Sequence, residues 1–179
     1  IFNYLSFIVM GIIFSPFLLK GKKFDYILVF ANSPVPQAFV GIFLRYLKKS
    51  KLILWVQDLW PDSLSVTTKS MPLFVFNAIN KFMKILYKKS SVIFVQSEMF
   101  VDEIIKFSID ENKIFYLPNW AENIFKNQTN PEGILKNDQK SILFAGNIGE
   151  AQNIEFIIEL IKHSRSLKIK WIFAGDGSK

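Results

Sequence analysis

Six short apolar runs, each ending in polar or glycine-rich residues, constrain the fold of this chain more than any other feature. They are rich in β-branched and aromatic residues, are separated by helix-length segments, and cover residues 26–30, 52–56, 92–95, 114–117, 142–145 and 171–174. Runs of this kind are typical of buried parallel strands in an α/β sheet. Because such sheets bind ligands beyond the carboxyl ends of their strands, we expect the functional residues there.

The rhythm of strands and helices breaks once, between residues 123 and 140, where asparagines accompany Pro131 and Gly133. This composition predicts a linker between two Rossmann-like domains. Residues 1–122 would form the N-terminal domain, lacking its first strands, and residues 141–179 would start the second. The chain begins without Met and stops after a strand-and-turn signal, so we interpret it as an internal fragment.

The segments between the strands predict helices at residues 36–49, 71–89, 97–107 and 153–162, with Ser97 as the N-cap of the third. Helix 71–89 is amphipathic. Its apolar face contains Val75, Ile79, Phe82, Met83 and Leu86. Its lysine stripe, Lys81, Lys84 and Lys88, fits either an ordinary solvent face or contact with anionic lipid headgroups.

Residues 1–19 carry no charge and approach the length that spans a bilayer. Three interpretations are open: a transmembrane helix, a helix buried against the sheet, and a helix lying in the membrane interface. Pro16 disfavours an uninterrupted span, and the segment leads directly into a strand. We therefore favour a buried or membrane-dipping helix.

The net charge of +7 comes largely from clustered lysines. Anionic lipid, nucleotide phosphate or nucleic acid would each suit such clusters, as would plain solvation. Nucleic acid is disfavoured because the chain contains no helix-turn-helix, zinc-finger or RNA-recognition signature. With no Cys and His163 as the single His, a disulfide framework and a His/Cys metal site are excluded.

The most specific motif places Gln57 and Asp58 after the second run, with Asp62 four residues later, and with Trp55 and Trp60 beside them. Carboxylates at a crevice accept hydrogen bonds from sugar hydroxyls or take a proton, and aromatic faces pack on sugar rings. Capping of a turn or helix is the alternative role, more so for Asp62 than for Asp58.

A glycine loop, residues 146–149, follows the fifth run and leads to the helix expected at 153–162. Glycines allow backbone to approach a phosphate, and a helix N-terminus carries positive dipole. We expect Gly149 at that approach, where a Cβ would displace phosphate or force an unfavourable backbone angle. The loop lacks G-x-G-x-x-G, so the dinucleotide fingerprint fails, and a purely structural turn is equally compatible.

Four motifs together resemble the family-4 glycosyltransferases, and most closely the bacterial subgroup that builds lipopolysaccharide O-antigen and capsule, including the fucosamine-type transferases. They are Trp-Val-Gln-Asp-Leu-Trp-Pro-Asp-Ser-Leu at 55–64, Pro-Asn-Trp-Ala-Glu at 118–122, Phe-Ala-Gly-Asn-Ile-Gly-Glu-Ala-Gln at 144–152 and Ala-Gly-Asp-Gly at 174–177. The resemblance implies a GT-B fold, in which two Rossmann-like domains face a common cleft. It also implies retaining transfer from a nucleotide-diphosphate sugar to a lipid-linked or polysaccharide acceptor, with no metal or other cofactor.

In this interpretation the second domain binds the donor and the first domain binds the acceptor. The protein itself would lie in the cytoplasm, in peripheral contact with the cytoplasmic face of the inner membrane. Asp58 is the candidate catalytic residue, and the substrate-binding candidates are Gln57, Asp62, Ser33, Glu98 and Asn119. The donor-binding candidates are Gly146, Asn147, Gly149, Gln152, Gly175 and Gly177.

The chain departs from the family's usual residues at three of these positions. Many members have His where Gln57 stands, and Arg and Lys where Asn147 and Gln152 stand. The helix dipole would then have to meet the diphosphate charge. The family's glutamate-pair motif would lie beyond Lys179, so we expect residues 1–179 alone to be inactive.

Two other functions are open. A Rossmann-type nucleotide-sugar epimerase or dehydrogenase would need G-x-G-x-x-G and a Tyr-x-x-x-Lys pair, and Tyr4 with Ile8 fails that spacing. A membrane-anchored, Rossmann-like nucleotide-sugar-binding or non-catalytic protein is the second alternative.

Overall fold

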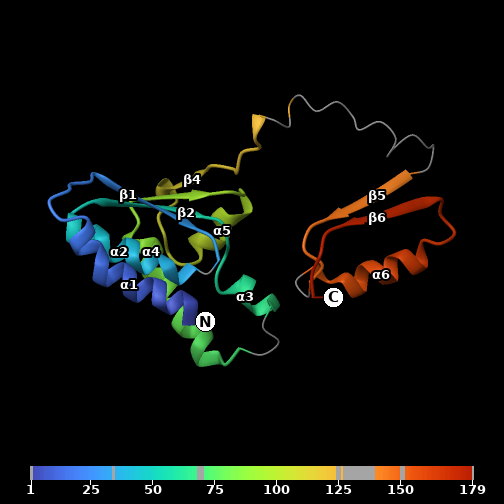
Figure 1. Cartoon of the computed structure of the whole chain (residues 1–179), viewed down its shortest axis with the longest axis horizontal. Coiled ribbons are helices and arrows are strands. Elements are labelled where there is room, and N and C mark those ends of the chain that lie inside the picture. Colours follow the sequence, from blue (N-terminus) through green and yellow to red (C-terminus); the bar gives the residue numbers. More distant parts are fainter. Residues whose placement is uncertain are drawn as a thin grey trace. The chain divides into compact units, whose positions relative to one another are not determined.

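The computed structural model describes residues 2–33, 35–67, 71–123, 126, 140–149 and 152–178. The chain forms two compact units, Ile1–Trp120 and Ala121–Lys179 (Figure 1). The predicted linker at 123–140 lies almost entirely outside the described residues. Each unit is described by itself below.

The first unit contains a four-stranded parallel sheet in the order β1-β2-β3-β4. Its strands are β1 (Tyr26–Ala31), β2 (Lys51–Val56), β3 (Val92–Val95) and β4 (Ile114–Tyr116). All four lie on apolar runs of the sequence, which confirms the predicted α/β class with parallel strands. Successive strands are neighbours in the sheet, so their carboxyl ends meet at one edge.

The helices α1, α2 and α4 lie on one side of the sheet in Figure 1; α1 precedes the first strand, and the later helices connect consecutive strands. In chain order they are α1 (Phe2–Leu18), the 3₁₀ turn η1 (Val35–Gln37), α2 (Ala38–Lys48), α3 (Asp62–Thr67), α4 (Leu73–Lys89), α5 (Met99–Ile105) and the 3₁₀ turn η2 (Glu111–Lys113).

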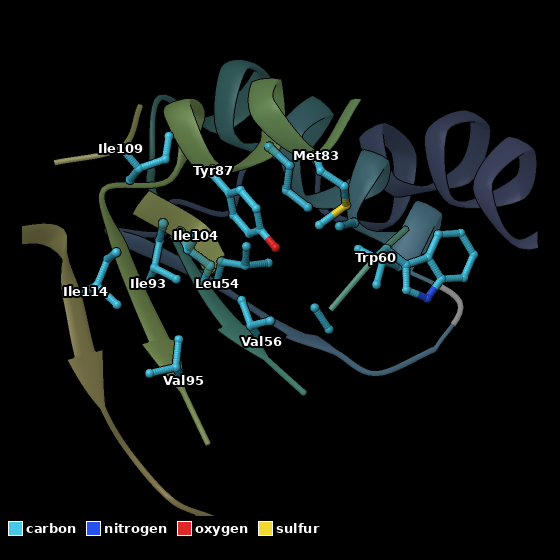
Figure 2. Close-up of a cluster of buried hydrophobic side chains, with 14 of the residues drawn as sticks. Leu54, Val56, Trp60, Met83, Tyr87, Ile93, Val95, Ile104, Ile109 and Ile114 are labelled. Carbon is cyan, nitrogen blue, oxygen red and sulfur yellow. The ribbon is translucent and has the colours of Figure 1, made fainter. Parts of the chain in front are cut away.

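The core lies between this side of the sheet and the helices (Figure 2). Alternate residues of β2 and β3, such as Leu54 and Ile93, point into it and pair across the strands. Met83 and Tyr87, one turn apart on α4, cover them from the helix side and are fully buried. The predicted apolar face of α4 is confirmed, with Phe82, Met83 and Leu86 buried and Val75 and Ile79 partly buried.

The opposite side of the first sheet is open. Large apolar side chains there are about half exposed: Tyr26, Leu28, Phe30 and Phe115. Burial of these strands on both sides, which their continuous apolar sequence predicts, is therefore wrong for the described structure. The physical reason is that the described helices cover one side alone.

Helix α1 packs on α2, where a Cβ added to Gly11 would lie 2.8 Å from Cγ2 of Val40. Lys48 Nζ donates to the carbonyl of Leu19, just after the helix ends. Full burial of the segment is wrong, because Phe7, Phe14 and other large apolar side chains of α1 are half exposed or more. No helix in the described part of the chain is long and apolar enough to cross a membrane.

Helix α5 begins later than expected, at Met99, and Glu98 is its N-cap residue. The assigned N-cap is therefore one residue later than the predicted Ser97, which takes part through its backbone carbonyl. Glu98 already has helical backbone angles, and the carbonyl of Ser97 accepts the first-turn hydrogen bond from the N–H of Phe100 at 3.1 Å.

The second unit contains β5 (Lys140–Ala145), α6 (Ile154–His163) and β6 (Ile169–Ala174). The two strands pair in parallel, from Lys140 with Ile169 to Ala145 with Ala174. The N-cap of α6 is Asn153, which has a left-handed backbone (φ 49°). This β-α-β unit confirms that the strand-loop-helix pattern restarts after residue 140.

Candidate functional site

Three amide side chains meet beyond the carboxyl ends of β2, β3 and β4. Asn119 Nδ2 donates to Gln57 Oε1 at 2.8 Å and to Gln96 Oε1 at 2.9 Å. Gln96 Nε2 donates to the backbone carbonyl of Gln57 at 2.7 Å. We call Gln57, Gln96 and Asn119 the amide cluster. Its members come from three neighbouring strand ends, which explains why residues up to 62 positions apart make contact.

The structure brings together two predicted site residues, Gln57 and Asn119, and adds Gln96, which the sequence analysis did not assign. Strand alternation could have found it. Gln57 lies two residues after Trp55, Gln96 lies two residues after Phe94, and Trp55 pairs with Phe94. Residues two apart share a side of the sheet, so both glutamines continue the open side past the strand ends.

An aromatic row borders the amide cluster on the open side. Phe30, Trp55, Phe94 and Phe115 occupy paired positions across all four strands. The Trp55 indole is buried, its Nε1 donates to the carbonyl of Leu117 at 3.1 Å, and its ring lies 5.7 Å from that of Trp120. Trp120 is 73% exposed and directly follows Asn119 in the sequence, so an accessible aromatic ring lies against Trp55, two residues before Gln57.

Asp58 is partly buried and has no described hydrogen bond to the amide cluster. The hydroxyl of Tyr87 is buried and has no hydrogen-bond partner among the described residues. Burial, and then the negative charges of Asp62 and Asp58, raise the pKa of Tyr87. The charge of Asp58 is therefore felt in the core, whereas its neighbour Gln57 joins the amide cluster.

The remaining predicted substrate residues of the first unit do not join the cluster by any described contact. Asp62 begins α3 and lines a cavity of about 330 Å³ together with Asn80, Glu103, Lys106 and Phe107. Ser33 Oγ accepts a hydrogen bond from Trp60 Nε1 at 2.8 Å, which ties the loop after β1 to the loop after β2. Glu98 is exposed at the start of α5.

The predicted donor residues of the second unit lie on two loops, after β5 and after β6, that hydrogen-bond to each other. The N–H of Gly146 donates to the carbonyl of Ala174, and the N–H of Ile148 donates to that of Asp176, both at 2.9 Å. A Cβ on Gly175 would lie 1.8 Å from the Gly146 carbonyl oxygen, and one on Gly177 would lie 2.0 Å from that of Ile148. Both positions therefore require glycine so that the loops can touch.

Gly149 is buried, and its neighbours are side chains rather than backbone. A Cβ there would meet Asn147 Nδ2 at 2.8 Å and Gln152 Oε1 at 3.2 Å, so two predicted donor-site amides converge over it. Its φ is not in the left-handed region, and the expected unfavourable backbone angle is wrong for Gly149. Gly146 is the loop glycine with positive φ, 151°. The loop then leads to the N-terminus of α6, the positive end of the helix dipole.

Three of the described basic side chains of the second unit stand away from this loop. Lys140 and Lys168 stand at the amino ends of β5 and β6, and Lys162 lies in the last turn of α6. Asp176, beside the loop, accepts a hydrogen bond from the Gly177 N–H at 2.7 Å. Within the described residues, no group of three or more His, Cys, Asp or Glu side chains is placed to hold a metal ion.

Comparison of this chain with models of protein families and with curated proteins gives no match.

Proposed function

We propose that this chain is part of a retaining glycosyltransferase of the GT-B type, which moves a sugar from a nucleotide diphosphate to a lipid-linked or polysaccharide acceptor in cell-surface polysaccharide synthesis. The observation that carries the proposal is the pair of glycine loops after β5 and β6, one of which leads to the N-terminus of α6. Backbone without side chains, next to a positive helix dipole, is suited to a diphosphate. The motif resemblance from residue 55 to residue 177 supports the same chemistry.

The mechanism that fits is front-face displacement. The bond from the anomeric carbon to the diphosphate breaks while the acceptor oxygen bonds to the same face, and the acceptor proton passes to the leaving diphosphate. The loop at Gly146 and the dipole of α6 would stabilise the charge on that leaving group. The amide cluster and Asp58 would belong to the acceptor and sugar side.

Nucleotide binding tests the donor half of the proposal. Titration calorimetry with UDP, GDP and dTDP measures the dissociation constant of each, in a protein that contains this chain and the rest of the second domain. Gly149→Val should weaken binding at least about tenfold, or roughly 1.4 kcal/mol, because it displaces Asn147 and Gln152 from the loop. Gly21→Ala, at an exposed turn of the first unit, is the control and should leave binding unchanged. Equal binding by wild type and Gly149→Val would remove this loop from the donor site.

Sugar transfer tests the catalytic half, in a protein that contains this chain and both walls of the cleft. Asp58→Asn keeps the size of the side chain and removes its charge. We expect turnover to fall about a hundredfold, within the usual range for loss of an acid or base. A change within about twofold would make Asp58 a residue of the fold.

Peripheral membrane contact is part of the proposal. The exposed apolar side chains of α1 and the lysines of α4 support it, since apolar area and basic charge together favour an anionic bilayer surface. Replacing Lys81, Lys84 and Lys88 by Glu should shift protein from anionic vesicles into the soluble fraction. Binding that resists both this change and high salt would contradict an electrostatic contribution.

A non-catalytic nucleotide-sugar-binding protein is the second candidate. The observation in its favour is that no described hydrogen bond joins Asp58 to the amide cluster. This candidate predicts nucleoside diphosphate binding without transfer, and an Asp58→Asn variant that binds like wild type.

A further inference from the structure

The hydrogen bonds of the amide cluster fix the orientation of all three amides. The anchor is the backbone carbonyl of Gln57, which can only accept, so Gln96 must present Nε2 to it and Oε1 to Asn119. Asn119 must then present Nδ2 to Gln96, and the second proton of Nδ2 reaches Gln57 Oε1. Reversing any one amide would bring two oxygens or two N–H donors face to face.

This order leaves two side-chain atoms without a partner among the described residues. Gln57 Nε2 is a donor shielded from solvent, which costs about 1–3 kcal/mol, and a ligand reaches it only by displacing the atoms that cover it. Asn119 Oδ1 is an acceptor on an exposed side chain that lies against Gln57. The cluster therefore has one unpartnered donor atom and one unpartnered acceptor atom, both neutral and both fixed in direction.

We propose that the amide cluster binds the hydroxyl or N-acyl groups of a neutral sugar ring whose apolar face packs on Trp120. This inference rests on the proposed function and names the substrate class of its sugar side. A hydroxyl or an amide both donates and accepts, as the free pair requires, whereas a carboxylate or phosphate would meet Asn119 Oδ1 with like polarity. Trp120 supplies the exposed aromatic face, and its ring lies 5.7 Å from that of Trp55, two residues before Gln57.

Gln96 is a positioning residue in this proposal. Its Nε2 and Oε1 are both engaged within the cluster, and without it Asn119 and Gln57 are no longer held in one orientation. Gln96→Leu should therefore weaken sugar binding about fivefold, the equivalent of roughly one net hydrogen bond.

Side-chain amide and indole signals in ¹⁵N NMR spectra of the whole chain provide the test. The probes are the methyl glycosides of N-acetylglucosamine and of glucose as neutral sugars, and that of glucuronic acid as the anion. We expect the neutral probes to shift the signals of Gln57, Asn119 and Trp120 at millimolar concentrations, and glucuronide to bind at least about fivefold more weakly, the loss of about one hydrogen bond. Gln37→Leu is the matched control, since Gln37 forms a similar amide pair with Asn32 beyond the end of β1.

A second variant covers the case in which Gln96→Leu does not fold. Trp120→Ala removes an exposed ring and should abolish the shifts at Gln57 and Asn119. The proposal is overturned if neutral glycosides leave these signals unmoved, if glucuronide binds as well as they do, or if Trp120→Ala and a folded Gln96→Leu bind like wild type. Calorimetry with nucleoside diphosphates separates the two proposals: glycoside binding without nucleotide binding keeps the sugar site and rejects the transferase, and the reverse rejects the sugar site alone.

Discussion

The carboxyl ends of the two parallel sheets present opposite kinds of surface. Beyond the strands of the first sheet the surface consists of side chains, three amides held by one another and by a backbone carbonyl. Beyond the strands of the second sheet it consists mainly of backbone, with glycines where the two loops approach most closely. The same strand-end position thus supports two kinds of recognition: directional contact with neutral polar groups in the first unit, and close backbone approach suited to phosphate in the second.

The largest effect we expect is in the second unit. Gly177→Val would place Cβ about where the Ile148 carbonyl lies, 2.0 Å away, so the loops after β5 and β6 must separate. The expected loss is about 2–4 kcal/mol in the free energy of unfolding. Hydrogen exchange at the N–H groups of Gly146 and Ile148, measured together with urea unfolding, should show both bonds opened.

Gly149→Ala is the matched control, because its Cβ meets the ends of two side chains that can move. It should cost less than about 1 kcal/mol, the range of substitutions without a backbone clash. Equal losses for the two variants would mean that backbone contact does not distinguish these glycines.

The next effect concerns the amide cluster. Asn119→Ala removes two hydrogen bonds, so we expect a loss of about 1–2 kcal/mol in the free energy of unfolding. The control Asn112→Ala removes one exposed side-chain bond, from Asn112 Nδ2 to Asp110 at 3.0 Å, and should cost about 0.5 kcal/mol. If Asn119→Ala costs no more than the control, the cluster does not hold its members in place.

The sequence predicted the class of fold because strand length, apolar runs and helix periodicity are local signals. The strand at Val92–Val95 has the predicted bounds, and α4 starts two residues later than expected. Exposure of the open side could not be predicted, because β1 is apolar at every position although its alternate residues are exposed. Which layers cover a sheet depends on contacts far apart in the sequence.

The candidate site was predictable to the level of strand ends and no further. Gln57 and Asn119 belong to the motifs at 55–64 and 118–122, whereas Gln96 becomes visible only when the register of β2 and β3 is known. Gly175 and Gly177 were assigned to the donor pocket, and their packing against the carbonyls of Gly146 and Ile148 depends on pairing between β5 and β6. The role of each residue in binding or catalysis stays a prediction.

The smallest effect concerns Tyr87. It tests whether the helix-covered core of the first unit is independent of the polar residues at the carboxyl ends of the strands. The Tyr87 ring packs edge-on against Phe107 at 5.3 Å between centroids, and its buried hydroxyl has no partner (Figure 2). Tyr87→Phe keeps that packing and removes an unsatisfied group. At pH 7 we expect the free energy of unfolding to stay the same or to rise by up to about 1 kcal/mol.

The difference in stability between wild type and Tyr87→Phe should depend on pH. Because burial raises the pKa of Tyr87 in the folded state, the unfolded chain loses this proton first, near the ordinary pKa of 10.0. Above that pH the unfolded state binds fewer protons, so wild type should lose up to about 1.4 kcal/mol per pH unit more than Tyr87→Phe does. Urea unfolding of both proteins between pH 8 and about pH 11, spanning the ordinary tyrosine pKa, measures the difference. A variant that is destabilised by more than about 1 kcal/mol at pH 7 would show that the hydroxyl has a hydrogen-bond partner. Asp62 would then be the first candidate and Asp58 the second, in the order in which their charges act on Tyr87.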